Sequence, residues 1–128
     1  MNIGEAATRA SLPVKTVRYY EEINLVSPDR SQNGYRSYSQ DDVKRLRFLQ
    51  RSRRLGFSIE ECRALLSLYQ DSHRASSEVK AMAGVKIAEI DSRIADLMDL
   101  RKHLSDLAAD CRGDDLPFCP IIEDLAAE

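Results

Sequence analysis

The chain has 128 residues, of which 43% are hydrophobic and 31% charged, enough for one compact domain or a small domain with an extended element. No run of about 18 apolar residues occurs, so we expect no membrane span and no membrane partner. The N-terminus lacks the apolar core of a signal peptide, and three cysteines, an odd number, do not indicate a disulfide framework. We therefore expect a cytoplasmic protein.

The net charge of −2 conceals an uneven distribution along the chain. Residues 1–70 contain 12 Lys and Arg against 8 Asp and Glu, whereas residues 71–128 contain 7 against 13. A basic N-terminal part suits a polyanionic partner, and an acidic C-terminal part does not. The excess of positive charge in residues 1–70 is a modest signal, since an ordinary solvated surface can carry a similar excess by chance.

Two short helices are predicted at the N-terminus. Residues 2–10 form the first, with Asn2 as its cap and Glu5 at the capping-box position. Pro13 suits the first turn of a second helix, which runs to about Glu22. Two short helices joined by a tight turn indicate a helix-turn-helix. The outer side of the second helix then presents four candidate DNA contacts, which are Lys15, Thr16, Arg18 and Tyr19.

The stretch from 26 to 39 predicts a small β-wing. Its Asn33-Gly34 dipeptide is favoured in type I′ hairpin turns, and the residues that follow alternate between two faces. This wing supplies three further candidate DNA contacts, which are Tyr35, Arg36 and Tyr38.

A third helix is predicted from Ser39, which caps it together with Asp42, to near Gly56. Its end carries three arginines, among which Arg54 is a candidate DNA contact. The outer face of the second helix, the wing and these arginines would provide one groove contact and two backbone contacts. The alternative for any single arginine is an ordinary solvated charge.

A second capping box, Ser58 with Glu61, predicts a helix from Ile59 to about Tyr69. Cys62 lies on its apolar face and is most simply a core residue. The sequence QDSHRASSE, residues 70–78, is then a polar break.

The segment from about 79 to 109 is the longest periodic part of the chain. Its apolar positions alternate at spacings of four and three over nearly four heptads, which is typical of a coiled-coil seam. The positions are Ala83, Ile87, Ile90, Ile94, Leu97, Leu104 and Ala108, with Arg101 interrupting. Such a stripe favours pairing with a second copy, parallel or antiparallel; packing on the N-terminal domain is the alternative.

Catalysis has little support in this sequence. The two histidines, His73 and His103, lie near no nucleophile motif, and no phosphate-binding glycine loop or zinc-protease motif occurs. We therefore expect a binding protein and no enzyme.

The stretch DCRGDDLPFCP, residues 110–120, holds Cys111 and Cys119 in a loop broken by glycine and proline. Thiolates are soft ligands that select Cu(I) or its congeners. Two thiolates favour linear coordination of a monovalent ion, whereas Zn²⁺ prefers four ligands. The alternatives are an incidental pair, a disulfide, or a pair of thiols that responds to oxidation.

The sequences TVRYYEEINLVSPDR and NGYRSYSQDDVKRLRFLQRSRRLGFSIEE, with the long helix behind them, closely resemble the MerR family of bacterial transcription regulators. The resemblance implies a mainly α fold: a winged helix-turn-helix domain, an antiparallel coiled-coil homodimer and a C-terminal effector site. It also implies a promoter whose two elements lie too far apart for RNA polymerase until the bound regulator distorts the DNA.

The tail DCRGDDLPFCPII is similar to that of the copper-efflux regulators of this family, the CueR/HmrR type, although it ends soon afterwards without an additional Cys/His-rich segment. This likeness implies an activator of copper-tolerance genes that responds to Cu(I), with Ag(I) or Au(I) possible. Members that sense divalent metals carry a cysteine at the start of the long helix, where this chain has Ser76.

The expected organisation has three parts: a DNA-binding domain at 1–70, a linker and dimerisation helix at 71–109, and a metal-binding loop with the C-terminal segment at 110–128. Two competing functions are a cytosolic copper buffer and a DNA-binding regulator that responds to thiol oxidation.

Overall fold

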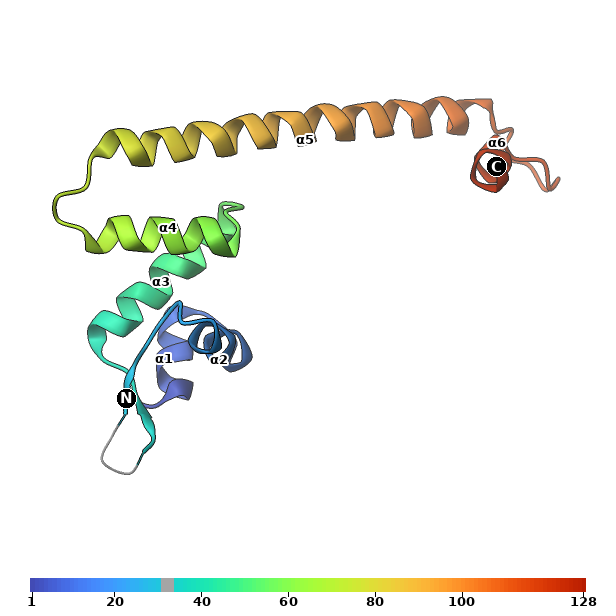
Figure 1. Ribbon diagram of the computed structural model, residues 1–128. Coiled ribbons are helices and arrows are strands. Elements are labelled where there is room, and N and C mark those ends of the chain that lie inside the picture. Colours follow the sequence, from blue (N-terminus) through green and yellow to red (C-terminus); the bar gives the residue numbers. More distant parts are fainter. Residues whose placement is uncertain (31–33) are drawn as a thin grey trace. The chain divides into compact units, whose positions relative to one another are not determined.

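The computed structural model describes residues 1–30 and 34–128, which form six helices and one small sheet (Figure 1). The elements are α1 (Ile3–Ala10), α2 (Val14–Glu22), β1 (Asp29–Arg30), β2 (Arg36–Ser37), α3 (Gln40–Arg54), α4 (Ile59–Gln70), α5 (Ser76–Asp110) and α6 (Pro120–Ala126). They divide into two compact units, Met1–Met82 and Ala83–Glu128. Within the described ranges, no helix combines the length and apolar character needed to cross a bilayer.

Local capping signals define where the helices begin. The Asn2 side chain accepts a hydrogen bond from the Glu5 N–H at 2.9 Å, which confirms the predicted cap of α1. Both predicted capping boxes are present at the starts of α3 and α4, each with reciprocal side-chain and backbone bonds, formed by Ser39 with Asp42 and by Ser58 with Glu61. Each box satisfies backbone donors that a helix start would otherwise leave unpaired.

The turn between α1 and α2 completes a helix-turn-helix. Ser11 adopts a left-handed conformation, with φ 58°, and ends α1. The Leu12 N–H then donates back to the Ala7 carbonyl at 3.0 Å, which closes the turn. The buried face of α1 consists of small residues, Ala6, Ala7 and Ala10, so α2 and α3 can pack closely against it.

The core of the N-terminal unit collects apolar side chains from α1, α2, α3 and α4. Val17, Leu46 and Leu49 are fully buried within it. Cys62 is also fully buried, and its thiol donates to the Phe57 carbonyl at 3.8 Å. The prediction that Cys62 is a core residue is therefore confirmed.

The wing is a short antiparallel pair in which Asp29 lies opposite Ser37 and Arg30 opposite Arg36. Gly34 has a positive φ of 78°, a conformation that glycine adopts without strain. Asn33, the other half of the predicted turn dipeptide, lies outside the described residues.

The long helix α5 begins at Ser76, three residues before the predicted start. Its first two turns belong to the N-terminal unit, because Met82 packs against the core there. The compact unit that contains the helix-turn-helix therefore ends at Met82, within α5. Farther along, the predicted seam is exposed in the single chain, with 58% exposure at Ile87, 50% at Ile94 and 64% at Leu97.

Candidate DNA interface and metal centre

The outer side of α2 carries the predicted contact residues. Lys15, Arg18 and Tyr19 are exposed and Thr16 is half-buried, while the inner side of the helix is buried in the core. This division follows the 3.6-residue period of a helix. A helix docked in a DNA groove needs this arrangement, with one face anchored and the other free to meet base edges.

Exposed basic and aromatic side chains also line the wing. Tyr35 is 76% exposed. Arg36 is exposed too, and its Nε donates to the carboxylate of Glu21, at the end of α2. Arg30 was not among the predicted contacts. It lies opposite Arg36 in the strand register, is exposed, and donates to the Gly34 carbonyl at 3.4 Å.

Tyr38 does not belong to this surface. It is only 1% exposed, so the prediction that it contacts DNA is wrong. Its hydroxyl donates to the other oxygen of Glu21 at 2.9 Å, and its backbone N–H donates to the Met1 carbonyl at 2.7 Å. Burial and the neighbouring Glu21 carboxylate raise the pKa of the Tyr38 phenol, which therefore stays a neutral hydrogen-bond donor.

The arginines at the end of α3 divide into two kinds. Arg53 donates to the Phe57 carbonyl at 2.9 Å and so supports the end of the helix. Arg54 is exposed in the last helical turn, as a DNA contact requires. Farther back, in the middle of α3, Arg47 donates to the Arg9 carbonyl at 3.0 Å and so connects α3 to α1. Basic side chains on this unit therefore have structural roles beside any role in DNA binding.

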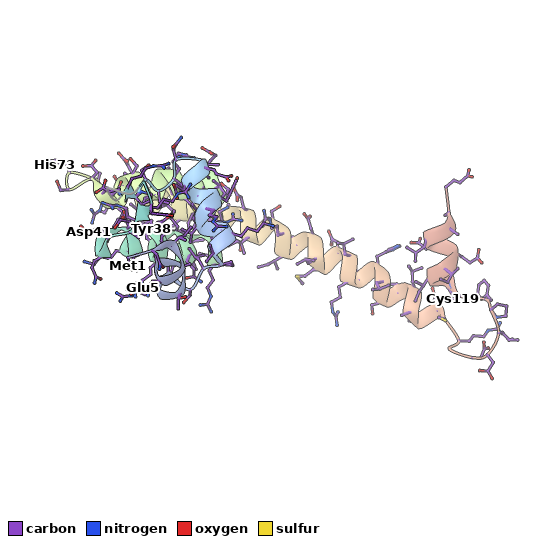
Figure 2. All side chains as sticks on the ribbon, turned by 90° about the horizontal axis from the view of Figure 1, so that it is seen from below. Met1, Glu5, Tyr38, Asp41, His73 and Cys119 are labelled. Atoms are coloured by element: carbon purple, nitrogen blue, oxygen red, sulfur yellow. The ribbon has the colours of Figure 1, made fainter. Side chains whose placement is uncertain are left out.

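The second candidate site is the loop between α5 and α6. Cys111 directly follows α5. Cys119, which Figure 2 labels, is the N-cap residue of α6. Gly113 turns the chain with a φ of 67°, and the Asp114 carboxylate accepts a hydrogen bond from the Leu116 N–H at 3.0 Å. Pro120 then starts α6, where its missing N–H costs nothing.

The Cys111 thiol lies close enough to Cys119 to influence the pKa of the Cys119 thiol. Both are free and half-buried. The backbone N–H of Ile122 and the Cys111 thiol hydrogen-bond to the sulfur of Cys119 and lower the pKa of that thiol. The thiolate is the form that binds metals, so this end of α6 favours a ligand. Over the described ranges, no cluster of three or more Cys, His, Asp or Glu is placed to hold a metal ion.

A side-chain contact also joins the two helices that flank this loop. His103 Nε2 of α5 lies 3.1 Å from a carboxylate oxygen of Asp124 in α6. Sequence patterns do not reveal this contact, because the two residues are 21 positions apart.

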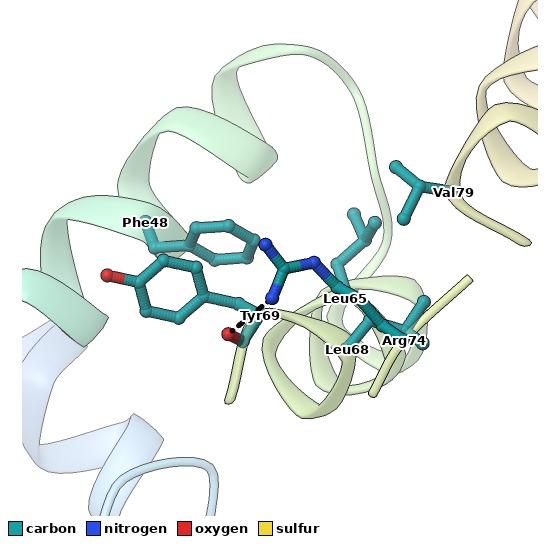
Figure 3. A pocket seen from close by; sticks show the side chains of 6 residues that line it. All are labelled: Phe48, Leu65, Leu68, Tyr69, Arg74 and Val79. Atoms are coloured by element: carbon teal, nitrogen blue, oxygen red, sulfur yellow. Dashed lines mark hydrogen bonds between the residues drawn. The ribbon is translucent and has the colours of Figure 1, made fainter. Parts of the chain in front are cut away.

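A small hollow lies among α3, α4 and the start of α5 (Figure 3). Its volume is about 180 Å³, and Phe48 and Tyr69 pack there with ring centroids 4.7 Å apart. Arg74 closes one side and donates to the Tyr69 carbonyl at 3.4 Å. The hollow is smaller than pockets for drug-sized ligands, which occupy about 300–1,000 Å³.

Two family models match the chain: the MerR HTH family regulatory protein model over residues 1–68, and the MerR DNA-binding model over residues 43–107. The chain belongs to the MerR family. The resemblance read from the sequence is therefore confirmed.

Individual MerR-family proteins match along almost the whole chain. The HTH-type transcriptional regulator HmrR of Rhizobium leguminosarum bv. viciae is 56% identical over 126 residues, which cover 98% of each chain. The HTH-type transcriptional regulator CueR of Salmonella typhimurium is 43% identical and covers 98% of this chain and 92% of its own. The relatives are transcription regulators.

A solved structure agrees with the fold. The transcription regulator PbrR691 from Ralstonia metallidurans CH34, crystallised in complex with lead(II), superposes with a TM-score of 0.85 at 33% identity. The match covers 98% of this chain and 99% of that one. The winged helix-turn-helix and the long helix are thus those of the MerR family.

Proposed function

We propose that the protein is a homodimeric transcription activator of copper-efflux or copper-tolerance genes that responds to Cu(I), and also to Ag(I) or Au(I). The observation that carries this proposal is the pair of free, half-buried thiols at Cys111 and Cys119, one of them held toward its thiolate form. The protein would act in the cytoplasm, where thiols stay reduced.

The donor set of the loop fits a monovalent soft ion. Two thiolates supply the linear coordination that Cu(I), Ag(I) and Au(I) accept, and the lead(II) complex of the related regulator PbrR691 supports a metal-responsive role. A bound monovalent ion would offset one of the two negative charges of the thiolates and link the end of α5 to the start of α6. The loop residues would keep the pair close, and α6 would supply backbone donors to Cys119.

The N-terminal unit would bind double-stranded promoter DNA. The exposed face of α2 would enter the major groove, where Arg18 can reach a base edge, while the wing and Arg54 would contact phosphates. Metal binding would shift the dimer between two states, so that the distorted promoter brings its elements into register for RNA polymerase.

The apolar seam of α5 supports the dimer. Several large apolar side chains remain exposed along this helix in the single chain, including Ile87, Ile94 and Leu97. A lone water-exposed helix seldom carries such a stripe, whereas an antiparallel coiled coil would bury it.

The DNA proposal predicts a sequence-dependent loss for Arg18→Ala. We expect affinity for an operator selected from random duplexes to fall about 5- to 150-fold, because a bidentate base contact contributes about 1–3 kcal/mol of discrimination. Fluorescence anisotropy with operator variants and random duplex measures the loss. Lys80→Ala, which removes an exposed charge from the start of α5, is the matched control and should retain near wild-type affinity. Equal weakening on every duplex would contradict base reading by Arg18.

The metal proposal predicts selectivity by charge. Transcription should respond to Cu(I), Ag(I) or Au(I) and ignore Zn²⁺ and Hg²⁺ at comparable free concentrations. Two thiolates do not complete the four-ligand shell that Zn²⁺ prefers, and Ser76 stands where members of the family that sense divalent metals carry a cysteine. X-ray absorption on the copper form should show about two sulfur neighbours. Ser76→Ala should change neither result, since Ser76 is not a proposed ligand. A strong Zn²⁺ response, or a shell of three or four ligands, would contradict the proposal.

The competing proposals are a cytosolic copper buffer and a regulator driven by thiol oxidation. A buffer needs neither the exposed face of α2 nor sequence-specific duplex binding, so the operator measurement separates it from a regulator. An oxidation sensor would respond to peroxide without metal and would form a Cys111–Cys119 disulfide, which mass spectrometry detects.

A further inference from the structure

Glu21 accepts two hydrogen bonds that join the end of α2 to the wing. Arg36 Nε donates to Oε1 of this carboxylate, and the Tyr38 hydroxyl donates to Oε2 at 2.9 Å. The Glu21 side chain is only 16% exposed, so these contacts are well shielded compared with an ordinary surface ion pair.

The position of this carboxylate is unfavourable in two other respects. Glu21 lies in the last turn of α2, where the helix dipole disfavours negative charge. It also adds negative charge to a surface proposed to meet DNA phosphates. The two bonds to the wing offset these costs.

The two donors differ in how firmly they are held. Tyr38 is buried, and its backbone is bonded to Met1 at both its N–H and its carbonyl. Arg36 is 44% exposed at its side chain, and among the described residues its guanidinium is held through Nε by Glu21. Both terminal NH₂ groups of Arg36 thus remain for a ligand.

We propose that Glu21 is a positioning residue, which holds the wing against α2 and aims the free end of Arg36 at a DNA phosphate. The inference rests on the proposed DNA-binding function. An arginine ordered before binding loses less side-chain entropy when the complex forms. The Glu21 carboxylate would thereby set the distance between α2 in the major groove and Arg36 at the DNA backbone.

The decisive variant is Glu21→Ala, because the two explanations predict opposite signs. Removing a negative charge near DNA should by itself strengthen binding. If Glu21 positions Arg36, binding should instead weaken about fivefold. Glu22→Ala is the matched control: Glu22 is the exposed neighbour, and its loss should leave affinity unchanged or raise it. Tighter binding by Glu21→Ala would overturn the proposal.

A double variant tests whether Glu21 acts through Arg36. Arg36→Ala should weaken binding to all duplexes and lower the salt slope by about one. Adding Glu21→Ala to Arg36→Ala should cause little further loss, since the positioned group is already gone. If the losses of affinity caused by the two single substitutions add fully in the double variant, the proposal is wrong. Glu21→Gln, which keeps one acceptor, should recover part of the affinity and serves if the alanine variant unfolds.

The metal-free, DNA-free protein supplies an independent readout. Amide hydrogen exchange at Arg36 and Ser37 should be faster in Glu21→Ala than in the wild type, and unchanged in Glu22→Ala. If amide exchange at the wing were unchanged in Glu21→Ala, Glu21 would not hold the wing, and the proposal would be wrong. If exchange is faster in Glu21→Ala but the wild-type protein binds no duplex, Glu21 does hold the wing and the proposed DNA-binding function is wrong. The two failures are therefore distinguishable.

Discussion

Replacing Cys111 or Cys119 with serine should reduce metal-induced transcription to the metal-free level. Each thiol supplies half of a two-coordinate site, and a serine hydroxyl is a hard, neutral ligand that Cu(I) does not favour. DNA affinity of the metal-free protein should stay within about twofold of wild type, because both half-buried positions belong to the unit Ala83–Glu128, outside the helix-turn-helix and the wing. A competition titration against a Cu(I) chelator, paired with duplex-binding measurements, separates the two effects.

Cys62→Ser is the control for these variants. Cys62 is fully buried and hydrogen-bonded to the Phe57 carbonyl, so its replacement should lower thermal stability. It should leave both Cu(I) affinity and the metal response in place. If Cys62→Ser alone removed the response while the protein stayed folded, the assignment of the ligands would be wrong.

Replacing Ile94 with arginine should separate the dimer and, with it, abolish tight operator binding. Ile94 lies in the middle of the predicted seam and is 50% exposed in the single chain. In a coiled coil its side chain would be enclosed, and an unpaired charge there would be costly. Losing the second DNA-binding unit should reduce operator affinity about 100-fold. Analytical ultracentrifugation and anisotropy measure the two effects.

Ser92→Arg adds the same charge to the same helix but outside the seam. It should remain dimeric and bind the operator like wild type. A dimeric Ile94→Arg protein with unchanged operator affinity would show that this stripe is not the dimer interface.

The elements that the sequence predicted well are those determined by neighbouring residues. Helix starts at Ser39 and Ser58 depend on a side chain three positions away, so the capping boxes could be identified directly. The buried side of α2 follows the helical period, which separates Val17 from Arg18. The tight turn at Ser11 was expected because short helices flank it.

The misjudged residues depend on contacts between distant parts of the chain. Alternation along the wing placed Tyr38 and Arg36 on one face, but it could not show that Glu21 of α2 lies beside both. Arg30 joins the wing surface through the strand register, which the turn dipeptide did not determine.

The surroundings of the two loop thiols also depend on contacts that sequence patterns do not predict. Spacing and residue type indicated a pair of soft ligands at Cys111 and Cys119, but not what surrounds them. The backbone donor from Ile122 and the contact of His103 with Asp124 arise when α6 folds beside the end of α5. A seven-residue helix is marginal alone, so such contacts help to determine whether it forms.

Run-off transcription with purified RNA polymerase shows whether Cu(I) converts the promoter-bound protein into an activator. The template carries the selected operator between widely spaced promoter elements, and free Cu(I) is held by a chelator buffer. If Cu(I) binding at the thiol loop activates the promoter, Cu(I) should raise transcript yield with wild-type protein, while Cys119→Ser should bind the same template and give no increase. Equal yields with and without Cu(I) for wild-type protein bound to the promoter would contradict this expectation.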